Sequence, residues 1–357
     1  MTRVSDFLWY IPNQADAGHR GDVALADHNS LDTLTHQAKA LEENGWTGAL
    51  LGTGWGRPDC FTVAAALAAR TTTFEPLAAI RPGHWHPAQF ASAAATLDHL
   101  TGGRLRVNVV SGRDDLAAYG DRESDPARRY ARTREFMRLV RRLWTEDAVT
   151  FDGDYYAVES STVVPRPEAR GDRLHPQLYF GGASEAAERV SATEADVQLF
   201  WGEPLDGVRD RIERLRTLSR DLDRDLPPLA FGLRVTTLVR DTTEQAWADA
   251  EAKVAEMARS QGAGWHDHRR ENAVGQQRLA ALAARGDVLD DNLYTAPGRF
   301  GGGGAATTWL VGSAADVARS LRKYQDLGVT HFILSDTPYL FEIERQGRQL
   351  LPLLRGL

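Results

Sequence analysis

The sequence predicts one domain over residues 1–357 with the α/β fold of a (β/α)8 barrel, and three observations favour it. About eight short apolar runs of strand length alternate with amphipathic runs of helical spacing along the 357 residues. No G-x-G-x-x-G follows the first apolar run, which counts against a doubly wound dinucleotide-binding sheet, the main competing architecture. No low-complexity linker or internal repeat divides the chain, and barrels run past about 200 residues as one domain.

The first half of the chain contains four strand–helix units. Its expected strands are residues 7–11, 47–51, 76–80 and 105–110. Its expected helices are residues 31–44, 61–69, 88–100 and 128–143. The first helix shows apolar residues three or four positions apart from Leu31 to Leu41, and Gly45 follows as a C-terminal signal. Pro12 and Pro82 each follow a strand, which they end because proline cannot donate a ladder hydrogen bond.

The second half continues the alternation but carries two insertions. Further strands are expected at residues 176–180, 197–201, 231–239 and 332–335. Residues 149–165 alternate apolar and polar side chains around Asp152-Gly153, which predicts a β-hairpin. Residues 243–308 form a long polar and helical segment that ends in the glycine run 301–304. Long insertions in a barrel generally cover the C-terminal face, where active sites lie.

The composition excludes several classes of protein. With 42 Lys+Arg against 49 Asp+Glu, the net charge is −7, and this counts against nucleic-acid binding. No stretch approaches the roughly 18 apolar residues of a membrane-spanning helix, and the apolar run before Pro12 is too short for a signal peptide. The single cysteine, Cys60, excludes an internal disulfide framework and a Cys-rich metal site. We therefore expect a cytoplasmic, soluble protein without a membrane or nucleic-acid partner.

Polar and aromatic residues recur where the expected strands end, which is where a barrel holds its functional groups. These residues are Gln14, Arg57, Asn108, Ser111, Ser184, Trp201, Arg234, Thr236 and Thr337. Arginine offers a fixed fork of donors to an oxyanion, and tryptophan offers an apolar wall against an aromatic ring.

Three local features each allow two interpretations. The turn of residues 181–184 before a helix offers backbone amides to a phosphate, or it is a tight βα turn and nothing more. The pairs His84/His86 and His266/His268 have metal-ligand spacing, but neither pair has a third ligand nearby, so we expect no metal. Cys60 precedes a helix, where a thiolate could be stabilised, yet a buried apolar role fits it better.

Several phrases, taken together, resemble the bacterial luciferase-like flavin monooxygenases, most closely their alkanesulfonate monooxygenase branch. The phrases with the clearest likeness are NGWTGALLGTG, TLDHLTGGRLRVNVVSG, QLYFGGASEAAERVSATEADVQLFWGEP and LGVTHFILSDTPYL. They recur in order over residues 6–355, so the resemblance covers nearly the whole chain. The R-x-x-x-x-V-V-S-G and YFGGAS phrases are specific together, where either alone would be weak.

The resemblance implies a cytoplasmic two-component monooxygenase. A partner NAD(P)H-dependent flavin reductase would supply reduced FMN, and O2 would be the co-substrate of a flavin peroxide. A small anionic organosulfur compound, such as an alkanesulfonate, would then lose its sulfur group by C–S cleavage to an aldehyde and sulfite. The cofactor would carry the oxygen chemistry while the protein positions the substrate and excludes water. A homodimer or homotetramer is also implied.

The resemblance also assigns roles to individual residues. Asn108 and Ser111 match positions beside the isoalloxazine ring, and Tyr130 matches one near the flavin phosphate. Gly182, Ala183 and Ser184 match the phosphate-binding turn. Arg234, Arg299 and Asn108 are expected to take part in catalysis, Arg299 as the arginine of a mobile loop. The residues expected on the substrate side of the pocket are Trp9, Gln14, Arg57, Trp201, Arg234, Thr236 and Thr337.

Four positions depart from the sulfonate enzymes. Gln14 and Thr236 stand where those enzymes carry histidines, Arg57 replaces a cysteine, and Thr337 replaces a tyrosine. Arg57 could add a second anion contact, or it could be a rim residue paired with Asp59. The departures leave room for hydroxylation or N-oxygenation of a non-sulfonate metabolite. An F420-dependent oxidoreductase and a non-catalytic flavin-binding protein are further alternatives.

Overall fold

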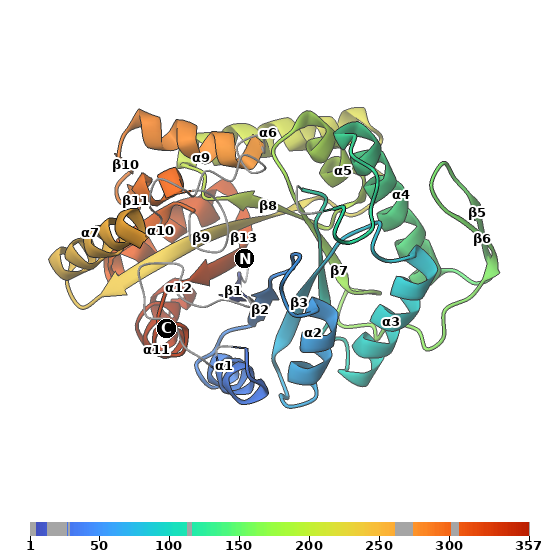
Figure 1. The fold of residues 1–357 in the computed structure, drawn as a ribbon, viewed down its shortest axis with the longest axis horizontal. Helices are drawn as coiled ribbons and strands as arrows, with labels where there is room; N and C mark the ends of the chain where they lie inside the picture. Colours follow the sequence, from blue (N-terminus) through green and yellow to red (C-terminus); the bar gives the residue numbers. More distant parts are fainter. Residues whose placement is uncertain are drawn as a thin grey trace.

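The computed structural model describes residues 5–12, 27, 29–112, 116–260, 274–300 and 307–356. Within this part of the chain, eight parallel strands close into a barrel, so the predicted fold is confirmed (Figure 1). In barrel order the strands are β1 (Asp6–Ile11), β2 (Gly48–Leu51), β3 (Glu75–Ile80), β4 (Arg106–Val109), β7 (Gln177–Gly181), β8 (Val197–Trp201), β9 (Ala230–Arg240) and β13 (Val329–Ser335). Pairing of β13 with β1 closes the ring.

Helices between the strands cover the outside of the barrel (Figure 1). They are α1 (Leu31–Glu43), α2 (Cys60–Ala68), α3 (Pro87–Leu100), α4 (Pro126–Thr145), α5 (Glu185–Glu194), α6 (Leu205–Asp221), α10 (Ala314–Leu327) and α11 (Tyr339–Gln349), followed by the short α12 (Leu351–Arg355). Side-chain caps begin several of them; Ser30, for example, accepts a hydrogen bond from the Thr33 amide. Among the helices of the described residues, none has the length and apolar character needed to cross a bilayer.

The first insertion is the expected hairpin. Strands β5 (Val149–Asp152) and β6 (Ala157–Ser161) pair antiparallel and project from the barrel beside α4 (Figure 1). Glu135 of α4 holds the base of the turn, because its carboxylate accepts hydrogen bonds from the amides of Asp154, Tyr155 and Tyr156.

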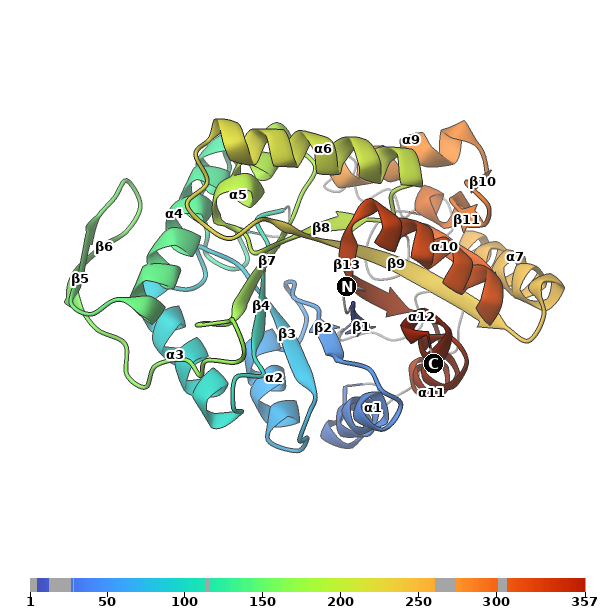
Figure 2. The same cartoon turned by 180° about the vertical axis from the view of Figure 1, so that it is seen from behind.

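The second insertion is longer and adds strands as well as helices. It contains α7 (Thr243–Ser260), α9 (Val274–Arg285), β10 (Val288–Leu289), β11 (Leu293–Tyr294) and the 3-10 helix η1 (Ala296–Phe300). Strand β12 (Trp309–Ser313), which the sequence analysis did not predict, pairs parallel with the second half of β9. Figure 2 shows α7 and α9 beside this extension of β9. Here Trp309 joins a small second core with residues of β9 and α7.

A buried ionic cluster closes the N-terminal end of the barrel lumen. Arg106, which is 4% exposed, donates from Nε to Glu75 at 2.6 Å and from Nη1 to Asp6 at 2.7 Å. Its Nη1 also donates to the Tyr179 oxygen at 2.6 Å. The four residues come from β4, β3, β1 and β7, so the cluster ties together strands that do not all neighbour one another.

Replacement of Arg106 by leucine tests the importance of this cluster for stability. The Asp6 and Glu75 carboxylates would lose the buried cation that they share and keep only Arg170 and His331 as partners, and breaking a buried pair typically costs about 3–5 kcal/mol. We expect R106L to lower the free energy of unfolding by about that amount in chemical denaturation. The control is R348L, because the side chain of Arg348 is 65% exposed. Equal stability of the two variants would contradict the account.

Candidate functional site

The C-terminal ends of the barrel strands bring together Tyr10, Trp201 and Arg234. The guanidinium carbon of Arg234 lies 4.1 Å from the centre of the Tyr10 ring. Strands β1 and β9 are separated by β13, so this contact crosses the lumen and both side chains point inward. Trp201 is the neighbour of Arg234 in the register of β8 and β9, and side chains paired in register share a face of the sheet. An arginine, a tyrosine and a tryptophan therefore meet at the C-terminal opening of the barrel, which we call the mouth.

Arg57 joins this group from the loop after β2. Its Nη1 donates to the Pro12 carbonyl at 2.9 Å and lies 3.5 Å from the Tyr10 hydroxyl. Gly52 makes room for the contact, because a Cβ there would lie 2.9 Å from Arg57 Nη1. Asp59 instead caps α2, accepting from the Thr62 amide at 2.8 Å. Arg57 is therefore directed toward Tyr10 at the mouth and is not paired with Asp59; its contact with an anion stays a prediction.

Trp9 does not lie at the mouth, in contrast to the expectation. It is 0% exposed and packs edge-on against Trp46, with ring centres 4.9 Å apart. Trp46 in turn donates to the Ile343 carbonyl of α11, so Trp9 lies on the outer face of β1 beneath the helices. Because side chains alternate along a strand, the inward position belongs to its neighbour Tyr10, which the sequence analysis missed.

Three of the expected flavin-side residues gather around the end of β4. Asn108 is buried on β4 and pairs in register with Tyr179 of β7. Ser111 follows the strand, and its hydroxyl lies 2.5 Å from that of Thr133 on α4. Tyr130, also on α4, contacts Phe180 of β7 edge-on. The structure thus places these residues on adjoining elements; their contact with a flavin stays a prediction.

The turn of residues 181–184 leads directly into α5. Ser184 is the N-cap, and its hydroxyl accepts a hydrogen bond from the Ala187 amide at 3.2 Å. Gly182 packs closely on this helix, because a Cβ there would lie 2.5 Å from that of Ala187. Its carbonyl accepts from Gln198, at 3.3 Å, and from Arg211. The tight βα turn is therefore present, while a phosphate at this helix N-terminus, with Ala183 in the turn, stays a prediction.

The second insertion packs over one side of the mouth, as expected for a long insertion. Helix α9 approaches Trp201 so closely that a Cβ on Gly275 would lie 3.3 Å from the Trp201 ring. The helix is held there by Arg278, whose Nε donates to Glu203 at 2.9 Å. Buried Arg211 of α6 donates to the same carboxylate at 3.0 Å. The loop after β8 is thus fastened to both α6 and α9.

Helix α7 is fastened to the end of β13 by a buried lysine. Lys253 Nζ donates to Asp336 at 3.0 Å, to the Thr337 carbonyl at 2.7 Å and to the Thr337 hydroxyl at 3.2 Å. Thr337 is fully buried in this contact. Thr236 lies beside Ser335, with their hydroxyl oxygens 3.5 Å apart. The sequence analysis missed Lys253, because nothing in the helical pattern of α7 marks it as buried.

Arg299 does not join the group around Tyr10. Arg299 lies on η1 with its side chain 51% exposed, and it forms an ion pair with Asp287. Gln14 and the glycine run 301–304 lie outside the described residues.

The candidate metal-binding histidines and the candidate reactive cysteine each have a local structural role. His84 stacks on Tyr119 with ring centres 3.8 Å apart, whereas His86 meets Tyr156, so the two rings take separate partners. His266 and His268 lie outside the described residues. Cys60 donates to the Leu51 carbonyl at 3.2 Å, and burial raises the pKa of its thiol to about 12. A thiol held in this way is not a reactive nucleophile at neutral pH.

The family of the chain follows from comparison with known proteins. A model of the luciferase-like monooxygenase family matches residues 5–331. The chain therefore belongs to this family, and its enzyme class is that of a flavin-dependent monooxygenase. The predicted family is confirmed, while the alkanesulfonate branch stays a prediction.

Three solved structures illustrate the range of proteins that share the fold. A riboflavin lyase with modified FMN and riboflavin as substrate has a TM-score of 0.76 at 19% identity, covering 99% of this chain and 92% of that one. EDTA monooxygenase from Chelativorans sp. BNC1 has a TM-score of 0.76 at 18% identity, covering 99% and 94%. An F420-dependent secondary alcohol dehydrogenase with an F420-acetone adduct has a TM-score of 0.69 at 16% identity, covering 99% and 99%.

Two acidic residues near Lys253, Asp336 and Glu342, make the stability of this region pH-dependent. Burial, reinforced by the nearby Asp336 carboxylate, raises the pKa of Glu342 to about 7 from its usual 4.5. The folded protein therefore holds a proton that the unfolded chain releases, so this group lowers stability as the pH rises from about 4.5 to about 7.

Replacement of Glu342 by glutamine should remove this contribution. We expect E342Q to gain about 1–3 kcal/mol over the wild type as the pH rises through that window. Thermal unfolding across the pH series measures the gain, with E344Q on the exposed side of the same helix as control. Parallel pH curves for wild type and E342Q would show that the carboxyl does not titrate there.

Proposed function

We propose that the protein is a two-component monooxygenase that uses reduced FMN and O2 to cleave the C–S bond of a small anionic organosulfur compound. The observation that carries the proposal is the position of Arg234, held on the Tyr10 ring at the C-terminal mouth of a luciferase-like barrel. A guanidinium binds a sulfonate or carboxylate with two parallel hydrogen bonds, and a ring beneath it restricts the directions it can take.

The residues around the mouth fit a flavin with a terminal phosphate. Asn108, Ser111 and Tyr130 would border the ring system, and the N-terminus of α5 at Ser184 would face the phosphate, where backbone amides favour an anion. Reduced FMN, supplied by a flavin reductase, provides the activation of O2 when bound. The family and the fit of these elements support the assignment of FMN.

The protein itself would orient and enclose the substrate. Arg234 would bind the anionic group, Trp201 would provide an apolar wall, and Arg57 would add positive charge at the rim. The insertion helices α7 and α9, fastened to the strand ends by Lys253 and Arg278, would limit the access of water. Arg299 would act only after leaving its contact with Asp287, as expected for an arginine of a mobile loop.

A second candidate keeps the cofactor but changes the substrate. The Thr337 hydroxyl and carbonyl are both engaged by Lys253, so the position that carries a tyrosine in sulfonate enzymes offers less to a substrate here. With fewer polar groups free at this position, the site would favour hydroxylation or N-oxygenation of a non-sulfonate anion. Use of F420 is the other alternative, because an F420-dependent dehydrogenase shares the fold.

The experiment is sulfite release from a panel of alkyl and aryl sulfonates, with FMN, NADH, O2 and a generic flavin reductase. Sulfite above the reductase-only control supports C–S cleavage. Oxygenated product without sulfite, from sulfonates or from a parallel panel of carboxylates and amines, favours the second candidate. Turnover with F420 and none with reduced FMN would overturn the FMN assignment.

Variants of Arg234 and Tyr10 test the role of the mouth. Loss of a hydrogen-bonded charge should lower kcat/KM in R234Q by about 10- to 100-fold. Y10L, which removes the ring beneath the guanidinium, should lower it less, and Y10F should stay near the wild type because the ring remains. Reduced-FMN affinity should be unchanged in all three variants. Wild-type kcat/KM in R234Q would contradict the proposed substrate contact.

A further inference from the structure

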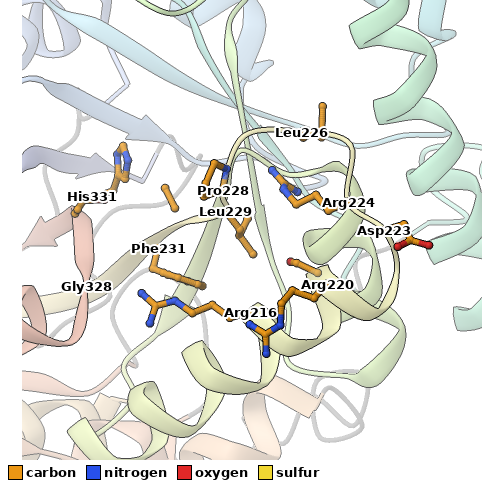
Figure 3. A pocket seen from close by; sticks show the side chains of 13 residues that line it. Arg216, Arg220, Asp223, Arg224, Leu226, Pro228, Leu229, Phe231, Gly328 and His331 are labelled. Carbon is orange, nitrogen blue, oxygen red and sulfur yellow. The ribbon is translucent and has the colours of Figure 1, made fainter.

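A cavity lies at the end of the barrel opposite the mouth. Its volume is about 900 Å³, and its lining comes from the C-terminal part of α6, the loop into β9, and the starts of β9 and β13 (Figure 3). Strand starts mark the N-terminal end of a parallel barrel, so this cavity is distinct from the proposed substrate site. Leu226, Pro228, Leu229 and Phe231 give it apolar walls.

Three arginines line this cavity at spacings of four residues, namely Arg216, Arg220 and Arg224 (Figure 3). The guanidinium carbon of Arg216 lies 5.5 Å from the centre of the Phe231 ring, and Arg220 donates to the Thr217 hydroxyl at 3.0 Å. Among the described residues, no carboxylate forms an ion pair with any of the three guanidiniums. Like charges four residues apart repel one another. Asp223 also lines the cavity, and three arginines against one aspartate leave a local excess of positive charge.

Arg224 shows that this charge is partly withdrawn from water. Its guanidinium donates to the carbonyls of Ala192 at 3.0 Å, Ala195 at 2.7 Å and Pro227 at 2.8 Å. Burial lowers its pKa to about 10. Its hydrogen-bond partners are carbonyls, while the Asp196 and Glu194 carboxylates act on it only at longer range, so part of its charge stays available to an anion in the cavity.

A buried histidine lines the barrel side of the cavity. His331 lines the cavity and is 7% exposed. Its Nδ1 lies 3.0 Å from the Tyr179 oxygen and 3.3 Å from an Asp6 oxygen. The ionised Asp6 carboxylate can only accept, so it favours the proton of a neutral His331 on Nδ1 rather than on Nε2. Within the described part of the chain, no protein group hydrogen-bonds Nε2.

We infer that this cavity binds an organic anion with a flat apolar body, such as an aromatic carboxylate. The acid group would meet Arg216 and Arg220, and the apolar body would pack against Pro228, Leu229 and Phe231. His331 would border the ligand from the barrel side. The inference is independent of the proposed function, because it involves neither the mouth nor a flavin.

Isothermal titration of the flavin-free protein with 2-naphthoate tests the site, with the uncharged 2-naphthamide as control ligand. We expect the wild type to bind 2-naphthoate and to bind the amide more weakly. The double variant R216Q/R220Q should lose at least about fivefold in affinity, as two partly exposed charge contacts are removed. The control variant R189Q/R348Q removes two exposed arginines elsewhere and should stay within about twofold of the wild type.

Three results would overturn the inference. They are no binding by the wild type at millimolar 2-naphthoate, equal affinity of wild type and R216Q/R220Q, and equal weakening in both double variants. R234Q separates the two ends of the barrel, because its affinity should match the wild type if the ligand occupies this cavity. Loss of affinity in R234Q alone would place the ligand at the mouth and would equally refute the site.

Discussion

The alternation of side chains along the strands of a closed parallel barrel decides which residues share the lumen, and both stability and site depend on it. On β1, Asp6 and Tyr10 point inward, whereas Trp9 points outward against Trp46. A slip of one residue in the register would exchange the two faces of the strand. It would bring Trp9 into the lumen and remove Asp6 from its contact with Arg106.

The inward-facing residues therefore form different groups at the N-terminal and C-terminal ends of the barrel. At the N-terminal end, Arg106 compensates Asp6 and Glu75 within a buried cluster. At the C-terminal end, Arg234 meets the Tyr10 ring in the group at the mouth.

The sequence predicted the eight barrel strands and the hairpin, because their apolar periods and turn residues are local signals. It missed β12, whose short apolar run follows a long polar insertion and pairs with the extension of β9 rather than with the barrel. It placed Trp9 at the site instead of Tyr10, because a strand buried on both faces gives no sign of which residue faces the lumen. Lys253 was missed for a related reason: its partners Asp336 and Thr337 lie more than eighty residues away.

The central proposal is a site for reduced FMN at the mouth, and its most direct test is an anaerobic titration of the protein with reduced FMN. We expect saturable binding of one reduced FMN per chain, with weaker binding of oxidised FMN and of reduced F420. Binding should persist in R234Q, since Arg234 is assigned to the substrate rather than to the flavin. Absence of reduced-FMN binding, or tighter binding of reduced F420, would contradict the assignment of the mouth as a site for reduced FMN.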